Sequence, residues 1–228
     1  MVSFESERDL QDVLFRLDRP LPDPEPYARL LLRREQPVGA SIPDLVYVGF
    51  LSEPPEDLWP ARWTFQHACL VWQLRRRPRL QPSTIARRTF QRSQQIDSLL
   101  HDLERSGAIR RLPTGAVQLS QALAAVRAEV IAVEAKLSRW RDALSQALGY
   151  GTFADKTIVA MPSNGIPYDP TARSAFSKAG VGLCGIARDG RVEWVIHPRP
   201  QSPTLGGERE FLIASASDGR RQTPWERL

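Results

Sequence analysis

Long apolar runs, cysteine and histidine are all scarce in this sequence of 228 residues, and each shortage argues against a class of protein. No apolar run approaches the roughly 18 residues that a membrane-spanning helix needs, so we expect no membrane association. The first five residues lack the basic and then apolar pattern of a secretion signal. We therefore expect the protein to stay in the cytoplasm.

The cysteines and histidines show no spacing that is typical of metal ligands. Cys69 and Cys184 both lie in apolar surroundings, so buried free thiols are the expected state. The Gly-x-Ser-x-Gly pattern of a nucleophile elbow is missing around Ser163, which argues against that type of hydrolase.

Lysine is rare too, and acidic residues are unevenly spread. The chain has 28 arginines and three lysines, with a net charge of +5. Residues 60–128 hold twelve arginines and three acidic residues, so this segment carries +9 and the rest of the chain −4. A basic segment in a mildly acidic chain indicates that one part binds a polyanion. A merely arginine-rich surface is the alternative, but it leaves the scarcity of acids in this segment unexplained.

The basic segment has the pattern of three helices followed by a hairpin. Apolar spacing predicts helices over residues 62–75, 82–88 and about 92–105, and Gly107 follows the third as a helix-ending residue. Residues 108–119 predict a tight hairpin. This succession resembles a winged helix-turn-helix, which we assign to residues 60–120.

The resemblance implies that the third helix enters a DNA major groove and that the hairpin contacts phosphates or the minor groove. The residues expected to bind DNA are Arg87, Arg88, Gln91, Arg92, Gln94, Gln95, Arg110 and Arg111. The alternative is a winged helix used for packing or dimerisation, in which these side chains form only a solvated face.

The segments on either side of the basic one predict apolar strands with isolated charges. One strand covers residues 29–36, and Asp44 opens a second that contains four strong β-formers. A third covers residues 130–136 and places Glu134 and Lys136 on one side. Because a carboxylate among apolar residues is costly unless something pairs with it, these charges are expected to meet partners.

Pro43-Asp44 on one strand and Glu134-Ala135-Lys136 on a later strand resemble the signature of the PD-(D/E)xK nuclease superfamily. Gln146 and Tyr150, on a helix predicted over residues 138–150, are similar to a Gln-x-x-x-Tyr element found in several branches of that superfamily.

The resemblance implies an α/β fold with a restriction-endonuclease-like αβββαβ core and a mixed sheet. Residues 1–58 and 121–200 would form this core, interrupted by the winged helix. From about residue 198 prolines, glycines and serines increase, so residues 201–228 are expected to form a partly flexible tail, in which residues 211–213 could still pack.

The resemblance also implies roles for individual residues. Asp44, Glu134 and the backbone carbonyl of Ala135 would bind Mg²⁺, with Mn²⁺ as a substitute. Lys136 would orient or deprotonate the attacking water, or stabilise charge in the transition state. Glu7, on the inward stripe of a helix predicted over residues 4–17, would complete the site as in many relatives, and Gln146 is a further catalytic candidate.

The sequence thus predicts a metal-dependent DNA endonuclease that holds duplex DNA with its winged helix. Cutting both strands would require a homodimer, since one site cuts one strand. The alternative is a DNA-binding regulator, or a subunit of a repair or defence complex, on a catalytically silent nuclease-like scaffold. A plain ion pair among Asp44, Glu134 and Lys136 would also account for these charges. An RNA-processing nuclease would need aromatic stacking platforms, and no aromatic cluster suggests them.

Overall fold

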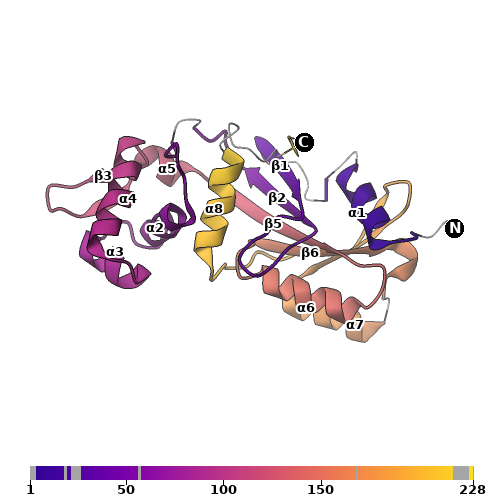
Figure 1. The fold of residues 1–228 in the computed structure, drawn as a ribbon. Helices are drawn as coiled ribbons and strands as arrows, with labels where there is room; N and C mark the ends of the chain where they lie inside the picture. The colour runs from indigo at the N-terminus through magenta and orange to yellow at the C-terminus, as the bar shows by residue number, and fades with distance from the viewer. Residues whose placement is uncertain are drawn as a thin grey trace. The chain divides into compact units, whose positions relative to one another are not determined.

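The computed structural model is an α/β structure that describes residues 4–17, 20–21, 27–55, 58–167, 169–217 and 226–227 (Figure 1). The chain divides into two compact units. The sheet unit contains residues 1–49, 129–204 and 225–228, and the helical unit contains residues 50–128 and 205–224. Among the described residues, no helix combines the length and the apolar composition needed to cross a membrane.

A mixed sheet of seven strands, in the order β8-β7-β6-β5-β2-β1-β9, organises the sheet unit. Its strands are β1 (Arg29–Arg34), β2 (Leu45–Phe50), β5 (Ala128–Ala135), β6 (Lys156–Pro162), β7 (Gly182–Ile186), β8 (Val192–Ile196) and β9 (Glu226–Arg227). β5, β6 and β7 run parallel, whereas β8 pairs antiparallel with β7 and β9 with β1. Every residue of β2 is buried, as is typical of a strand covered on both faces.

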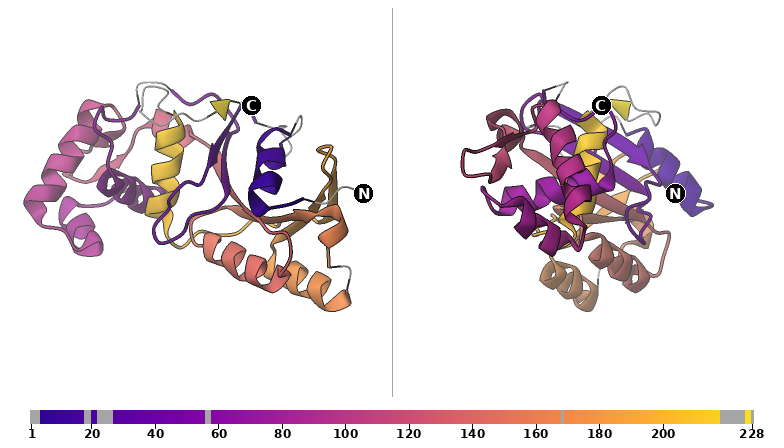
Figure 2. Two further views of the ribbon diagram at one scale, coloured as in Figure 1. Left: turned by 45° about the vertical axis from the view of Figure 1, so that its right-hand side comes forward. Right: turned by 60° about the vertical axis from the view of Figure 1, so that its left-hand side comes forward.

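Helices cover both faces of this sheet (Figures 1 and 2). On one face, α1 (Glu7–Phe15) packs Leu10 and Leu14 into a core with residues from five neighbouring strands. On the other face, α6 (Trp140–Tyr150) and α7 (Pro170–Ala179) lie side by side in a second core that includes Val159 and Leu183. The alternation of side chains along each strand supplies both cores at once.

The helical unit contains α2 (Phe65–Arg76), α3 (Pro82–Thr89), α4 (Ser93–Arg105), α5 (Gln121–Ala125), α8 (Gly206–Ser217) and a hairpin of β3 (Ile109–Arg111) with β4 (Val117–Leu119). The predicted helices and hairpin are all present, each with boundaries within three residues of the prediction. Their ends follow local signals: Thr64 caps α2, Pro82 opens α3, and Gly107 follows α4 with a positive φ.

Helix α8 departs from the expected flexible tail. The glycines that suggested declining order instead allow close packing against α2, because a Cβ on Gly206 would overlap the ring of Trp72. In α8, Glu210 is fully buried and lies 2.8 Å from Arg75 Nε of α2. The helical unit therefore includes residues 206–217 beyond the predicted 60–120. Residues 218–225 and 228 of the expected tail lie outside the described residues.

The two cysteines are free, as predicted, but only Cys184 on β7 is buried. Cys69 on α2 is partly exposed. The expectation of two buried thiols is thus wrong for Cys69, because a helix in a small unit turns part of its surface to solvent.

Candidate functional site

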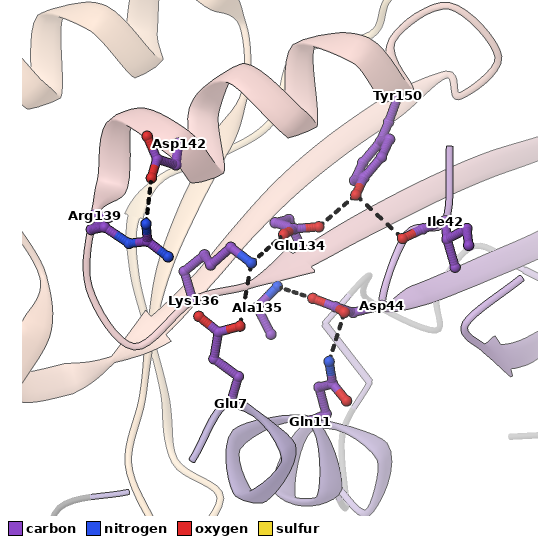
Figure 3. A network of polar contacts seen from close by, with 10 residues as sticks. All are labelled: Glu7, Gln11, Ile42, Asp44, Glu134, Ala135, Lys136, Arg139, Asp142 and Tyr150. Atoms are coloured by element: carbon purple, nitrogen blue, oxygen red, sulfur yellow. Dashed lines mark hydrogen bonds and ion pairs between the residues drawn. The ribbon is translucent and has the colours of Figure 1, made fainter. Parts of the chain in front are cut away.

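A cluster of charged side chains lies where β2 begins and β5 ends (Figure 3). These two strands are neighbours in the sheet, so Asp44, just before β2, lies beside Ala135 although 91 residues separate them in the chain. Glu134 is the penultimate residue of β5, and Lys136 follows its end. Strand pairing therefore brings the two halves of the sequence pattern to one point.

Both oxygens of the Asp44 carboxylate accept a hydrogen bond. Gln11 Nε2 donates to Oδ1 at 2.6 Å, and the backbone N–H of Ala135 donates to Oδ2 at 2.7 Å. Burial and the nearby charge of Glu134 raise the pKa of Asp44 to about 6, although the Ala135 N–H and Lys136 act in the opposite direction. The negative charge here is therefore only partly compensated.

Glu134 is the most enclosed acid of the cluster, with 2% of its surface exposed. The hydroxyl of Tyr150, from the last turn of α6, donates to Oε2 at 2.5 Å, and Lys136 Nζ lies 3.1 Å from Oε1. Tyr150 also lies 3.5 Å from the carbonyl oxygen of Ile42, but its single proton belongs to the shorter bond. Burial and Glu134 together raise the pKa of Tyr150, which keeps it a donor.

Lys136 lies between two carboxylates, with Nζ 3.1 Å from Glu134 and 3.3 Å from Glu7 Oε2. Burial lowers the pKa of Lys136, but the hydrogen bonds and charges of Glu134 and Glu7 outweigh it, and the net effect raises the pKa. In this arrangement Lys136 is an ammonium group. It can therefore donate hydrogen bonds and stabilise negative charge, but it is not poised to accept a proton.

Helix α1 contributes two residues to the cluster from one face. Glu7 and Gln11 are four residues apart, so their side chains project side by side while Leu10 anchors the helix in the core. Glu7 reaches Lys136, and Gln11 reaches Asp44 (Figure 3). The structure thus brings Glu7 to the cluster and adds Gln11, which no pattern in the sequence had indicated.

The other predicted site residues are placed differently. Ala135 takes part through its N–H, which binds Asp44. Gln146 is exposed on α6, outside the hydrogen-bonded network, while Tyr150 one turn later enters it. The spacing of four between Gln146 and Tyr150 was visible in the sequence, but it could not show which of them faces the cluster.

The chemistry of the cluster suits a hard divalent cation, because Glu7, Asp44 and Glu134 offer carboxylate oxygens, and burial together with the charge of Glu134 raises the pKa of Asp44. In the part of the chain that the structure describes, no three His, Cys, Asp or Glu side chains are grouped to hold a metal ion. The carboxylate oxygens of Asp44 and Glu134 instead accept hydrogen bonds, and Glu134 also forms an ion pair with Lys136. Mg²⁺ would thus have to replace some of these bonds.

The residues predicted to bind DNA all belong to the helical unit. On α3, α4, the turn between them and β3, Arg87, Arg92, Gln94, Gln95, Arg110 and Arg111 are exposed, while Arg88 and Gln91 are partly buried. Ile96 and Leu100 of α4 face the core, which leaves the opposite, polar side of the helix to solvent. Arg111 lies 3.8 Å from Glu104, so part of its charge is already compensated.

No protein-family model, curated protein or solved structure matches this chain. An assignment of function therefore rests on the residues of the cluster and on the charge of the helical unit.

Proposed function

We propose that the protein is a Mg²⁺-dependent DNA endonuclease of the PD-(D/E)xK type. The observation that carries this proposal is the hydrogen bond from the Ala135 N–H to Asp44, which joins the two separated halves of the motif beside Glu134 and Lys136. The element order α1-β1-β2, then β5-α6-β6 with β5 and β6 parallel, also supports an αβββαβ core interrupted by the helical unit.

Each residue of the cluster then has a role in hydrolysing a phosphodiester. Asp44 and Glu134 would hold Mg²⁺, which when bound supplies an activated water and a Lewis acid for the phosphate. Lys136, as an ammonium group, stabilises the negative charge that grows on the phosphate oxygens. Glu7 and Tyr150 are positioning residues, since Glu7 contacts Lys136 and Tyr150 contacts Glu134.

The helical unit is proposed to hold duplex DNA as a winged helix. The order α2-α3-α4-β3-β4 fits that module, with α4 as the recognition helix. Residues 58–96 contain eight arginines and no acidic residue, which gives this stretch a strong attraction for phosphates. Double-strand cleavage would require two copies of the chain, each cutting one strand.

A DNA-binding regulator on a silent scaffold is the second candidate. It is favoured by the hydrogen bonds that occupy Asp44 and Glu134, and by the lack of a preformed three-ligand metal group among the described residues. In that case the cluster would serve only as a buried ion-pair network that holds β2, β5 and α1 together.

Cleavage of supercoiled plasmid and of linear duplex, with Mg²⁺, Mn²⁺ or EDTA, separates the two candidates. Lys136→Ala is the test variant, and Lys156→Ala is a matched control because Lys156 also pairs with a glutamate of β5, at 2.7 Å, outside the cluster. The nuclease proposal expects metal-dependent cutting by the wild type and by Lys156→Ala, and none by Lys136→Ala. Salt-sensitive DNA binding without cutting by any of the three proteins would support the regulator.

A further inference from the structure

Phe90 is exposed to an unusual degree for a large apolar side chain. It lies at the turn between α3 and α4, and 97% of its surface is open to solvent. Ile42, at 60%, is the next most exposed large apolar residue among those the structure describes. A phenylalanine in this position adds nothing to the core of the helical unit.

The backbone of Phe90 is also in a conformation that suits another residue. Phe90 has φ 54° and ψ 34°, the left-handed region in which glycine or asparagine is usual at a helix C-terminus. The turn is held there by the N–H groups of Phe90 and Gln91, which both donate to the carbonyl of Ala86. Phe90 therefore carries both backbone strain and an exposed apolar ring, and such violations of local preference concentrate at functional positions.

The surroundings of Phe90 point to the kind of molecule that would cover it. Arg87 and Arg88 belong to the last turn of α3, and Arg92 precedes the first residue of α4. Within the described parts of the chain none of these three has a carboxylate partner in an ion pair, so their charge is available to phosphates. An aromatic ring among free cations is the combination that binds a nucleotide by its base and its phosphate together.

We propose that Phe90 stacks on an unpaired base, so that the preferred substrate is DNA in which a duplex is interrupted by unpaired nucleotides. In an intact duplex each base is stacked on both faces, and the major groove offers an aromatic ring little more than a thymine methyl. An unpaired base exposes a whole face, and one such stacking contact strengthens binding roughly tenfold. This inference rests on the DNA-binding part of the proposed function and narrows it to a substrate class.

The test measures binding of the full chain in EDTA, where metal-dependent cutting is absent, by fluorescence anisotropy. The two probes are one labelled duplex and the same duplex with a single-nucleotide bulge. The wild type should bind the bulged duplex roughly tenfold more tightly than the intact one. Phe90→Gly and Phe90→Ala should lose this preference while keeping the affinity for intact duplex, and Phe90→Trp should keep both.

Phe90→Gly keeps the test independent of folding. Glycine fits the left-handed turn without strain, so its melting temperature should stay within a few degrees of the wild type. A bulge carrying 2-aminopurine gives a second readout, because stacking quenches its fluorescence. Quenching should appear with the wild type and disappear with Phe90→Gly. Equal loss of affinity for both duplexes in Phe90→Gly, or a preference retained by Phe90→Gly or Phe90→Leu, would overturn the stacking proposal.

The two proposals fail in different ways. A bulge preference that depends on Phe90, in a protein that never cuts, would leave the stacking contact standing and remove the nuclease. Metal-dependent cutting by a protein whose bulge preference survives in Phe90→Gly would do the reverse. Absence of binding to either duplex would overturn both the stacking contact and the DNA-binding role.

Discussion

The two ends of strand β5 carry the same three side-chain types in the same contacts. Near its start, Glu129 accepts a hydrogen bond from Tyr27 at 2.5 Å and lies 2.7 Å from Lys156 Nζ. Near its end, Glu134 accepts one from Tyr150 at 2.5 Å and lies 3.1 Å from the Nζ of a lysine. A glutamate, a lysine and a tyrosine are therefore not sufficient to define a site.

The two ends of β5 differ in burial and in neighbouring charge. The side chain of Glu129 is 30% exposed, whereas that of Glu134 is 3% exposed. Glu134 also shares its surroundings with Asp44, whose pKa it helps to raise, and shares its lysine with Glu7. In the proposed metal site, this excess of carboxylates over cations would favour binding of a divalent ion.

Removing the charge of Glu134 or of Glu129 tests the difference between the two ends, and catalysis should respond most. Glu134→Gln should lower the rate of metal-dependent DNA cleavage on the order of 10²–10³-fold, since it removes a charge from the proposed metal site. Glu129→Gln should cut close to the wild-type rate. Single-turnover rates with saturating enzyme make the comparison independent of DNA affinity, and equal losses in both variants would contradict the assignment.

A second effect is the dependence of stability on pH without metal. Because the pKa of Asp44 is raised to about 6 in the folded protein, ionising Asp44 destabilises the fold, so stability is lost as pH rises from about 4 to 6. Asp44→Asn removes that cost, and Gln11 can rotate its amide to accept from the new donor. Its unfolding free energy relative to the wild type should rise by about 1–2 kcal/mol between pH 4 and pH 8.

Asp12→Asn is the control of opposite sign for that measurement. The hydrogen bond from Arg34 lowers the pKa of Asp12, so its ionised form favours the folded state. Asp12→Asn should therefore lose stability relative to the wild type as pH rises to about 4, with a constant difference at higher pH. Urea unfolding in EDTA measures the pH dependence of both variants. The same trend in both would show that the pH dependence does not come from Asp44.

Metal binding gives a third and smaller effect. If Mg²⁺ is present at tenfold its dissociation constant, it should stabilise the wild type by about 1.4 kcal/mol, visible as a higher melting temperature. The shift should vanish in Asp44→Asn and persist in Glu129→Gln. It should also weaken below pH 6, because Asp44 must lose its proton to bind the ion. An equal shift in Asp44→Asn would place the ion elsewhere.

The smallest expected quantity is the difference in stability cost between the two tyrosine variants. Tyr150→Phe leaves Oε2 of the nearly enclosed Glu134 without its donor and should cost about 1–2 kcal/mol of stability. Tyr27→Phe removes the matching bond from a glutamate that water can reach, and it should cost less than about 1 kcal/mol. Chemical denaturation measures the free energy of unfolding of both variants. A larger loss in Tyr27→Phe than in Tyr150→Phe would contradict the prediction.

Local sequence patterns were enough to predict most of the secondary structure. The period of two in residues 130–136 and the period of 3.6 in residues 92–105 depend only on neighbouring residues, so β5 and α4 were predicted with small errors at their ends. Pro82 and Gly107 marked helix boundaries for the same reason. The tail was mispredicted because Gly206, which allows close helix packing, looks in sequence like a loop residue.

Within the cluster, the sequence identified the charges that an apolar strand cannot tolerate alone. Asp44 and Glu134 stood out because burying a carboxylate is costly unless it has partners, whatever the fold. Gln11 did not stand out, because an uncharged polar residue on an amphipathic helix is ordinary. The choice between Gln146 and Tyr150 depended on the rotation of α6, which is fixed by packing of Ala143 and Ala147.

Neighbouring residues were therefore enough to predict most of the helices and strands, the basic segment and the charges that need partners, although they did not predict α8. The contact of Asp44 with Ala135 and the position of Lys136 between Glu134 and Glu7 follow from the tertiary structure instead. It also leaves the ring of Phe90 exposed to solvent. Distances, burial and charge states depend on which distant segments the sheet and the helices bring together, and no local pattern contains that information.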